Sequence, residues 1–132
     1  MSFFDRFFSE QREELPENWK TFHAPEQLDE IVDRSFHRPV AIFKHSTRCG
    51  ISLMAKRQLE RDWGQAPHAI ELYYLDLLSY RPVSNLVEEK LGILHQSPQV
   101  IVVHRGEVRY HSSHQDISVG AMREALDDQR PA

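Results

Sequence analysis

The chain has 132 residues, a formal net charge of −4 and 27% charged residues, a composition that predicts one domain with its own hydrophobic core. No basic stripe interleaved with aromatic residues argues for a nucleic-acid partner, and the longest apolar runs fall far short of the roughly 20 residues of a membrane span. The first residues lack the basic start and unbroken apolar region of a secretory signal, so we expect a cytoplasmic protein.

Residues 1–18 are expected to form an extension rich in aromatic side chains. Its phenylalanines recur at helical spacing, which predicts a short helix with one aromatic face: Phe3, Phe4, Phe7 and Phe8. The helix could dock on a membrane surface or a partner, or it could pack on its own domain. We favour packing, because the polar face lacks the Lys and Arg residues typical of interfacial helices. Residues 19–132 are then the folded domain.

Apolar periodicity predicts alternating strands and helices in that domain. The expected strands cover residues 19–22, 40–44, 70–77, 99–104 and 108–111. The expected helices lie within residues 25–36, 50–64 and 81–91, and from about Ser118 onward. The first helix is expected to bury Leu28, Ile31, Val32 and Phe36. The second is expected to expose Lys56 and to bury Ile51, Met54, Ala55, Leu59 and Trp63.

The order of these elements is β-α-β-α-β-α-β-β-α. Strands that alternate with helices pair in parallel through right-handed crossovers, and the terminal hairpin adds an antiparallel edge. Residues 40–44 carry apolar side chains on both faces, as an interior strand does. The sequence therefore predicts a thioredoxin-like α/β fold, with a central mixed sheet of about five strands and helices on both faces.

Cys49, the only cysteine, lies between the strand of residues 40–44 and the helix that follows. Unpaired N–H groups and the helix dipole favour a negative charge there, so helix N-termini lower the pKa of a thiol. A thiol of pKa about 8.5 is only about 3% ionised at neutral pH, and a decrease of about 2 units makes it mostly thiolate. Lys44, His45 and Arg48 add positive charge nearby.

A lone cysteine is often only a small buried apolar residue. The polar flank of Cys49, which includes Thr47 and Arg48, argues against that interpretation and favours a reactive thiol. Cys49 to Ser52 form a C-x-x-C pattern with serine in the second cysteine position. Because Ser52 cannot displace a sulfur, a mixed disulfide on Cys49 has to be resolved by a thiol from another molecule. The sequence predicts a monothiol mechanism.

Ser97 and Pro98 directly precede the strand of residues 99–104. A proline can simply begin a strand, where its missing donor is tolerated. In the thioredoxin arrangement, a cis proline at this point lies against the active cysteine and leaves the preceding backbone free to pair with substrate. We therefore predict a cis Ser97–Pro98 bond. The eight histidines do not reproduce a recognisable ligand spacing, so no metal site is expected.

Three segments together resemble the monothiol bacilliredoxin family, the YtxJ-like proteins of the bacillithiol system: residues 43–52, 74–76 and 96–99. The resemblance extends from about Trp19 to the last helix. It implies a thioredoxin-like fold and a Cys49 that removes bacillithiol from protein mixed disulfides. It also implies bacillithiolated proteins as partners, bacillithiol as co-substrate without a bound cofactor, and recycling by a low-molecular-weight thiol or a reductase. The family's frequent T-C-P-I-S motif has proline where this chain has Gly50.

Two other functions stay open. The segment of residues 49–52 is one side chain away from the C-G-F-S motif of monothiol glutaredoxins, which bridge an iron–sulfur cluster with cysteine and glutathione. Residues 111–116, however, contain no Gly-Gly-x-Asp-like segment of the kind that seats glutathione in those proteins. The third possibility is a thioredoxin-like binding module without exchange chemistry. For the exchange reaction at Cys49, the residues expected to support the thiolate or to bind substrate are His45, Thr47, Arg48, Ser52, Ser97 and Pro98.

Overall fold

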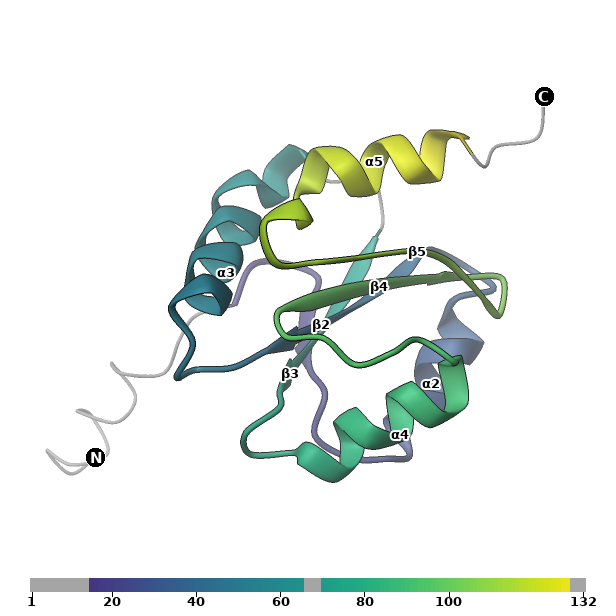
Figure 1. Cartoon of the computed structure of the whole chain (residues 1–132). Helices are drawn as coiled ribbons and strands as arrows, with labels where there is room; N and C mark the ends of the chain where they lie inside the picture. The colour runs from purple at the N-terminus through teal and green to yellow at the C-terminus, as the bar shows by residue number, and fades with distance from the viewer. Residues whose placement is uncertain (1–14, 66–69, 129–132) are drawn as a thin grey trace, which may run out of the picture.

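The computed structural model describes residues 15–65 and 70–128, so the predicted aromatic helix of residues 3–8 lies outside the described part. Five strands form one mixed sheet in the order β1-β3-β2-β4-β5 (Figure 1). They are β1 (Trp19–Thr21), β2 (Val40–His45), β3 (Glu71–Asp76), β4 (Gln99–His104) and β5 (Glu107–Ser113). β1 and β2 run parallel to β3, whereas β4 is antiparallel to β2 and to β5. The predicted mixed sheet with an interior β2 is confirmed.

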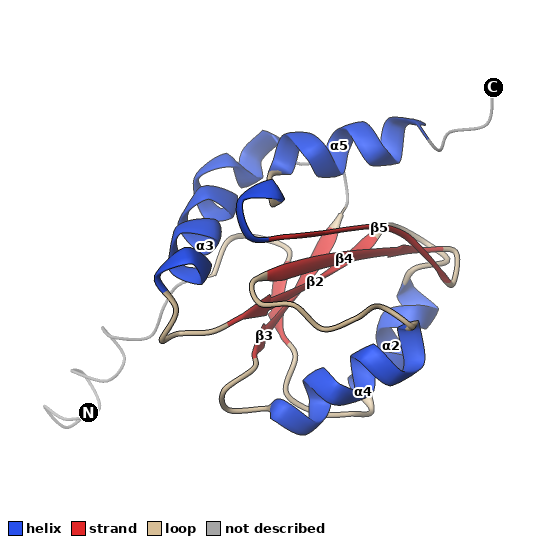
Figure 2. Ribbon diagram, in the orientation of Figure 1, coloured by secondary structure: helices blue, strands red, loops and turns tan. Residues whose placement is uncertain are grey.

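Helices cover both faces of this sheet (Figure 2). The helices are α2 (Gln27–Arg34), α3 (Gly50–Asp62), α4 (Arg81–Leu91) and α5 (Val119–Asp128), with short 3₁₀ turns η1 (Trp63–Gln65) and η2 (His114–Asp116). α3 and α5 lie on one face, and α2 and α4 lie on the other (Figure 1). This three-layer arrangement is the predicted one. No helix in the described ranges has the length and apolar character needed to cross a membrane.

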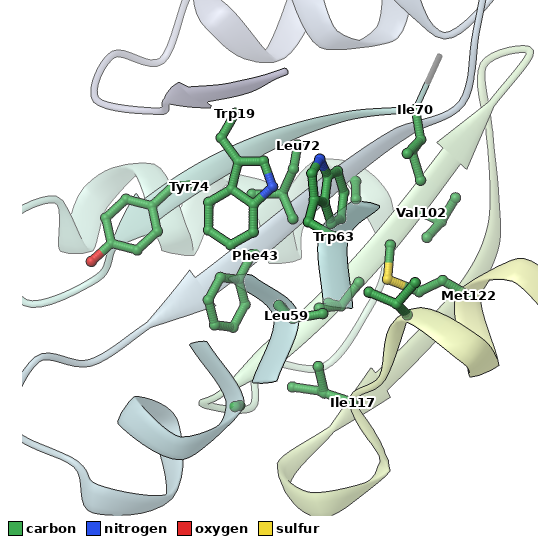
Figure 3. Packing of buried hydrophobic residues seen from close by; sticks show 14 residues of the cluster. Trp19, Phe43, Leu59, Trp63, Ile70, Leu72, Tyr74, Val102, Ile117 and Met122 are labelled. Atoms are coloured by element: carbon green, nitrogen blue, oxygen red, sulfur yellow. The ribbon is translucent and has the colours of Figure 1, made fainter. Parts of the chain in front are cut away.

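The hydrophobic core has two parts, one on each side of the sheet. Phe43 of β2 points into the layer of α3 and α5, and its neighbour Ile42 points into the layer of α2 and α4. In the first part, the rings of Trp19 and Trp63 meet edge to face with centroids 5.4 Å apart (Figure 3). Strand β2 is therefore apolar on both faces up to Phe43, and only its last two residues are polar.

Helix α3 is rotated relative to the apolar face that its sequence predicts. Ile51 is 44% exposed and Met54 is 70% exposed, while Lys56 is only 3% exposed, so these three predictions are wrong. The predicted burial of Ala55, Leu59 and Trp63 is confirmed. Lys56 is accommodated because its ammonium pairs with Glu60 one turn later and lies 5.7 Å from the centre of the Tyr74 ring. A polar anchor at the start of the helix, Ser52, sets this rotation.

The turn between β4 and β5 accounts for a second difference between the predicted and the observed structure. Arg105 and Gly106 have φ values of 55° and 78°, which form a two-residue hairpin turn, so β5 begins already at Glu107. Both turn N–H groups donate to Ser35, to its carbonyl at 2.7 Å and to its hydroxyl at 2.9 Å. Phe36 was expected on the inner face of α2, but it follows that helix and is 59% exposed. Its ring lies over Gly106 of the turn. That prediction is wrong.

A buried carboxylate at the start of β3 ties helix α2 to the sheet. Glu71 is 3% exposed. Its carboxylate accepts hydrogen bonds from Nε of Arg34, at 2.7 Å, and from a terminal nitrogen of the same guanidinium group. Arg38 donates to the same carboxylate at 3.2 Å, and Lys20 lies 3.7 Å from it. The hydrogen bond from Arg34 and the nearby cations lower the pKa of Glu71, against the opposing effect of burial.

Two helix ends follow the sequence closely. Gly92 ends α4 with φ 71°, a left-handed conformation that glycine adopts without the clash of a β-carbon. Ser118 precedes α5, and its hydroxyl accepts the N–H of Ala121 at 3.0 Å, as an N-cap residue does. These ends fix the lengths of the helices that flank the carboxyl-terminal hairpin.

Candidate active site

Cys49 lies where strand β2 gives way to helix α3. Its N–H donates to the carbonyl of Ser46 at 3.2 Å, which closes the turn, and its own carbonyl accepts the N–H of Leu53 at 3.0 Å. Cys49 is the N-cap residue of α3, with φ −109° and ψ 121°, and its side chain makes no capping hydrogen bond. It is a free, partly exposed thiol. The thiol is therefore accessible and close to the unpaired N–H groups of a helix N-terminus.

Ser52 fastens the first turn of α3 to the end of β2. Its hydroxyl is fully buried, lies 2.6 Å from Nδ1 of His45 and accepts the N–H of Ser46 at 2.9 Å. The His45 ring in turn lies beside the rings of Phe43 and Tyr74, with centroids 5.8 Å and 5.6 Å away. Ser52 thus stands in the place of a second cysteine and also holds both sides of the turn that carries the thiol.

Replacing Ser52 by alanine is expected to lower the free energy of unfolding by about 2 kcal/mol, because the Ser46 N–H and Nδ1 of His45 both lose this buried partner. Urea unfolding measures the change. The matched control is Ser118→Ala, which removes one hydrogen bond at a partly buried helix end and should destabilise by about 1 kcal/mol. Equal effects of the two variants would show that the buried network contributes nothing beyond one capping bond.

Thr47 and Arg48 occupy the exposed part of the turn. Within residues 15–65 and 70–128, neither side chain makes a hydrogen bond or an ion pair, so nothing holds them against Cys49. Their support of the thiolate stays a prediction. In the same ranges no group of three or more His, Cys, Asp or Glu side chains is placed to hold a metal ion.

The Ser97–Pro98 segment lies at the same edge of the sheet as Cys49. The antiparallel pairing of Lys44 with Gln99 places the preceding residue, Pro98, beside His45. The Ser97–Pro98 bond is cis, which confirms the prediction. The carbonyl of Pro98 accepts the N–H of His114 at 3.1 Å, so η2 borders the segment. The Ser97 hydroxyl is buried, and no described group bonds to it.

Sequence reasoning missed the direction of Lys44. Because side chains alternate along a strand, Lys44 lies on the face opposite to Phe43 and His45 and is fully buried under α4. Its positive charge is therefore not in the layer of Cys49. The contacts of Lys44 with Ser84 and His95 were not foreseen, although the period of two along β2 was a signal that could have placed this side chain.

Gly50 is the first residue of α3, where proline is common, and nothing lies within 4 Å of a β-carbon built there. Cys49 already has the extended backbone that a residue before proline prefers. Gly50→Pro is therefore expected to raise the free energy of unfolding by about 0.5–1 kcal/mol, measured in urea, and to leave exchange by Cys49 intact. Gly92→Pro is the matched control. It should destabilise, because φ 71° is closed to proline.

An accessible thiol at a helix N-terminus, at the same sheet edge as a cis proline that precedes the neighbouring antiparallel strand, defines a thioredoxin-fold thiol oxidoreductase. The chain belongs to the monothiol bacilliredoxin family: the family model described as monothiol bacilliredoxin BrxC matches residues 20–122. The match includes every residue of the site described above and ends within α5.

Solved structures agree with the thioredoxin fold. A chain described as a candidate oxidoreductase with a thioredoxin fold is 25% identical, with a TM-score of 0.72, over 82% of this chain and 93% of that chain. Thioredoxin from Trypanosoma brucei brucei is 19% identical, with a TM-score of 0.66, over 89% and 94% of the two chains. Thioredoxin O2 from Arabidopsis thaliana is 11% identical, with a TM-score of 0.65, over 90% and 100%. The last two show the shared fold.

Proposed function

We propose that this protein removes bacillithiol from protein mixed disulfides by a monothiol exchange at Cys49. The observation that carries the proposal is the pairing of an accessible thiol at the start of α3 with a fully buried serine in the position of a second cysteine. The match of residues 20–122 to the monothiol bacilliredoxin family supports the choice of bacillithiol as the low-molecular-weight thiol. We place this activity in the cytoplasm, where thiols are kept reduced.

The reaction conserves electrons at each step. The thiolate of Cys49 attacks the bacillithiol sulfur of the mixed disulfide, a new S–S bond forms to Cys49, and the substrate cysteine leaves as a thiolate that takes up a proton. A second thiol then attacks the Cys49 adduct and releases Cys49 as a thiolate. Because Ser52 offers only a buried hydroxyl, this second thiol comes from another molecule, a low-molecular-weight thiol or a reductase.

The reduced protein should be incubated with a bacillithiolated protein and the products analysed by intact-mass and peptide mass spectrometry. We expect one bacillithiol adduct, located on Cys49, and an equivalent amount of reduced substrate. A substrate that keeps its adduct in the presence of excess protein would contradict the proposal. A stoichiometric iron–sulfur absorbance spectrum that depends on Cys49, in protein prepared without oxygen, would support the cluster carrier instead.

A further inference from the structure

Lys44 is a buried cation directly next to the active-site layer. The residue is fully buried, and its Nζ lies 3.3 Å from the carbonyl of Ser84 on α4 and 3.2 Å from Nδ1 of His95. Burial lowers the pKa of Lys44 to about 8, with Glu88 acting to raise it and Arg81 to lower it. A lysine is rarely buried to this extent unless its ammonium has partners, because removing its charge from water is unfavourable.

His95 connects Lys44 to the loop that leads to Pro98 at the candidate site. Its Nδ1 is shared between Nζ of Lys44 and the hydroxyl of Ser84, at 3.2 Å and 3.3 Å. An ammonium group can only donate, so Nδ1 must keep its lone pair and His95 must be neutral with its proton on Nε2. Burial lowers the pKa of His95, and the charges of Lys44 and Arg81 lower it further, while Glu88 opposes them.

The contact fixes the loop that leads from α4 to β4. His95 lies in residues 92–98, and the side chain of Gln99, paired directly with Lys44 across the sheet, holds the residues on either side of it. Nε2 of Gln99 donates to the carbonyl of Leu94 at 3.0 Å, and its Oε1 accepts the N–H of Gln96 at 3.4 Å. Three consecutive loop residues are thus anchored immediately before Ser97 and Pro98.

We propose that Lys44, Ser84 and His95 form a latch that positions the Ser97–Pro98 segment for the binding of protein substrate beside Cys49, and that protonation of His95 opens it. The proposal rests on the exchange activity proposed above. A proton on Nδ1 would place His95 as a cation against Lys44 and Arg81, with Glu88 as the opposing anion among the described residues, and would remove the acceptor that Lys44 uses. Lys44 and His95 are positioning residues, since neither contacts the reacting sulfur.

The first test separates substrate binding from reactivity. Lys44→Met and His95→Phe each remove one side of the latch and should raise KM for a bacillithiolated protein about ten-fold, the effect of losing one hydrogen bond to a charged group. The rate constant kcat and the rate of Cys49 alkylation by iodoacetamide, which needs no Ser97–Pro98 segment, should stay within about two-fold of wild type. An unchanged KM in both variants would overturn the latch.

The second test uses a conservative variant and the pH. In His95→Asn, the amide oxygen can replace Nδ1 as acceptor but cannot be protonated, so KM should match wild type at about pH 7 and should not rise toward about pH 5 as that of wild type does. The ratio of the two KM values at each pH removes every pH effect that the two proteins share. His104→Asn is the matched control, since His104 also has a lowered pKa but lies at the other end of β4. It should keep the wild-type pH profile.

A readout without substrate distinguishes failure of the latch from failure of the proposed function. Amide hydrogen exchange should show protection of residues 94–97 that falls several-fold between about pH 7 and about pH 5 in wild type, and that is low at both pH values in Lys44→Met. Equal protection in the two proteins would overturn the latch even if adduct transfer occurs. The expected protection without any adduct transfer would leave the latch standing and contradict the exchange function.

Discussion

Replacing Cys49 by serine is expected to reduce adduct transfer by more than about 10³-fold, because a hydroxyl does not attack a disulfide sulfur. The same change should leave the protein as stable or up to about 1 kcal/mol more stable. Cys49 has the extended backbone of an N-cap residue but makes no capping bond, and serine is among the best N-cap residues. Stopped-flow transfer assays with mass detection, together with urea unfolding, measure both effects.

A repositioned thiol is the control for this variant. The double variant Cys49→Ser, Glu124→Cys carries one exposed thiol on helix α5, within the helix and away from its N-terminus. It should transfer no more adduct than Cys49→Ser, because neither the helix N-terminus nor the Ser97–Pro98 segment is beside the new thiol. Recovery of transfer in the double variant would mean that any accessible thiol performs the reaction and that the site geometry is unimportant.

Replacing Glu71 by glutamine is expected to lower the free energy of unfolding by about 2 kcal/mol, between the values typical of exposed and buried ion pairs. The carboxylate is buried, whereas Arg34 and Arg38 reach solvent and can be hydrated when it is lost. Because the pKa of Glu71 is lowered in the folded protein, this stabilisation is present above its unfolded pKa of about 4.3 and disappears as the pH falls through the folded value.

Urea unfolding of wild type and Glu71→Gln at neutral pH and at acid pH tests this expectation. The difference between the two proteins should shrink below about pH 4, where the unfolded wild-type chain binds a proton that folded Glu71, with its lowered pKa, does not yet bind. Asp62→Asn is the control, because Asp62 pairs with Arg61 on the surface of α3 and should change stability by less than about 0.5 kcal/mol. A pH-independent difference for Glu71→Gln would show that side-chain packing, and not charge, is responsible.

The fold could be predicted because local sequence patterns mark its strands and helices. Gly92 and Ser118 mark helix ends through backbone and capping preferences that act within a few residues. The rotation of α3 could not be predicted in the same way. The apolar residues Ile51 and Met54 favoured one face, but the hydrogen bonds of Ser52 to groups at the end of another element selected a different one.

The parts of the candidate site that depend on residues close in sequence could be predicted. Cys49 at the start of α3 and the cis bond before Pro98 were both expected from neighbouring residues and from the resemblance. The Lys44–His95 contact joins residues that are 51 positions apart, and neither side chain belongs to an apolar period or a metal-ligand spacing. Such a pair becomes visible only when the fold places the loop after α4 against the end of β2.

Strand β2 ends in two polar residues whose side chains lie on opposite faces of the sheet. His45 contacts Ser52 beside the turn that carries Cys49, and Lys44 contacts His95 in the loop that leads to Pro98. Deleting a single residue earlier in β2 would send the histidine under α4 and the lysine under α3, because side chains alternate between the faces of a strand. Both anchors would then fail together. The length of the strand before these two residues is therefore constrained, although no single contact reveals it.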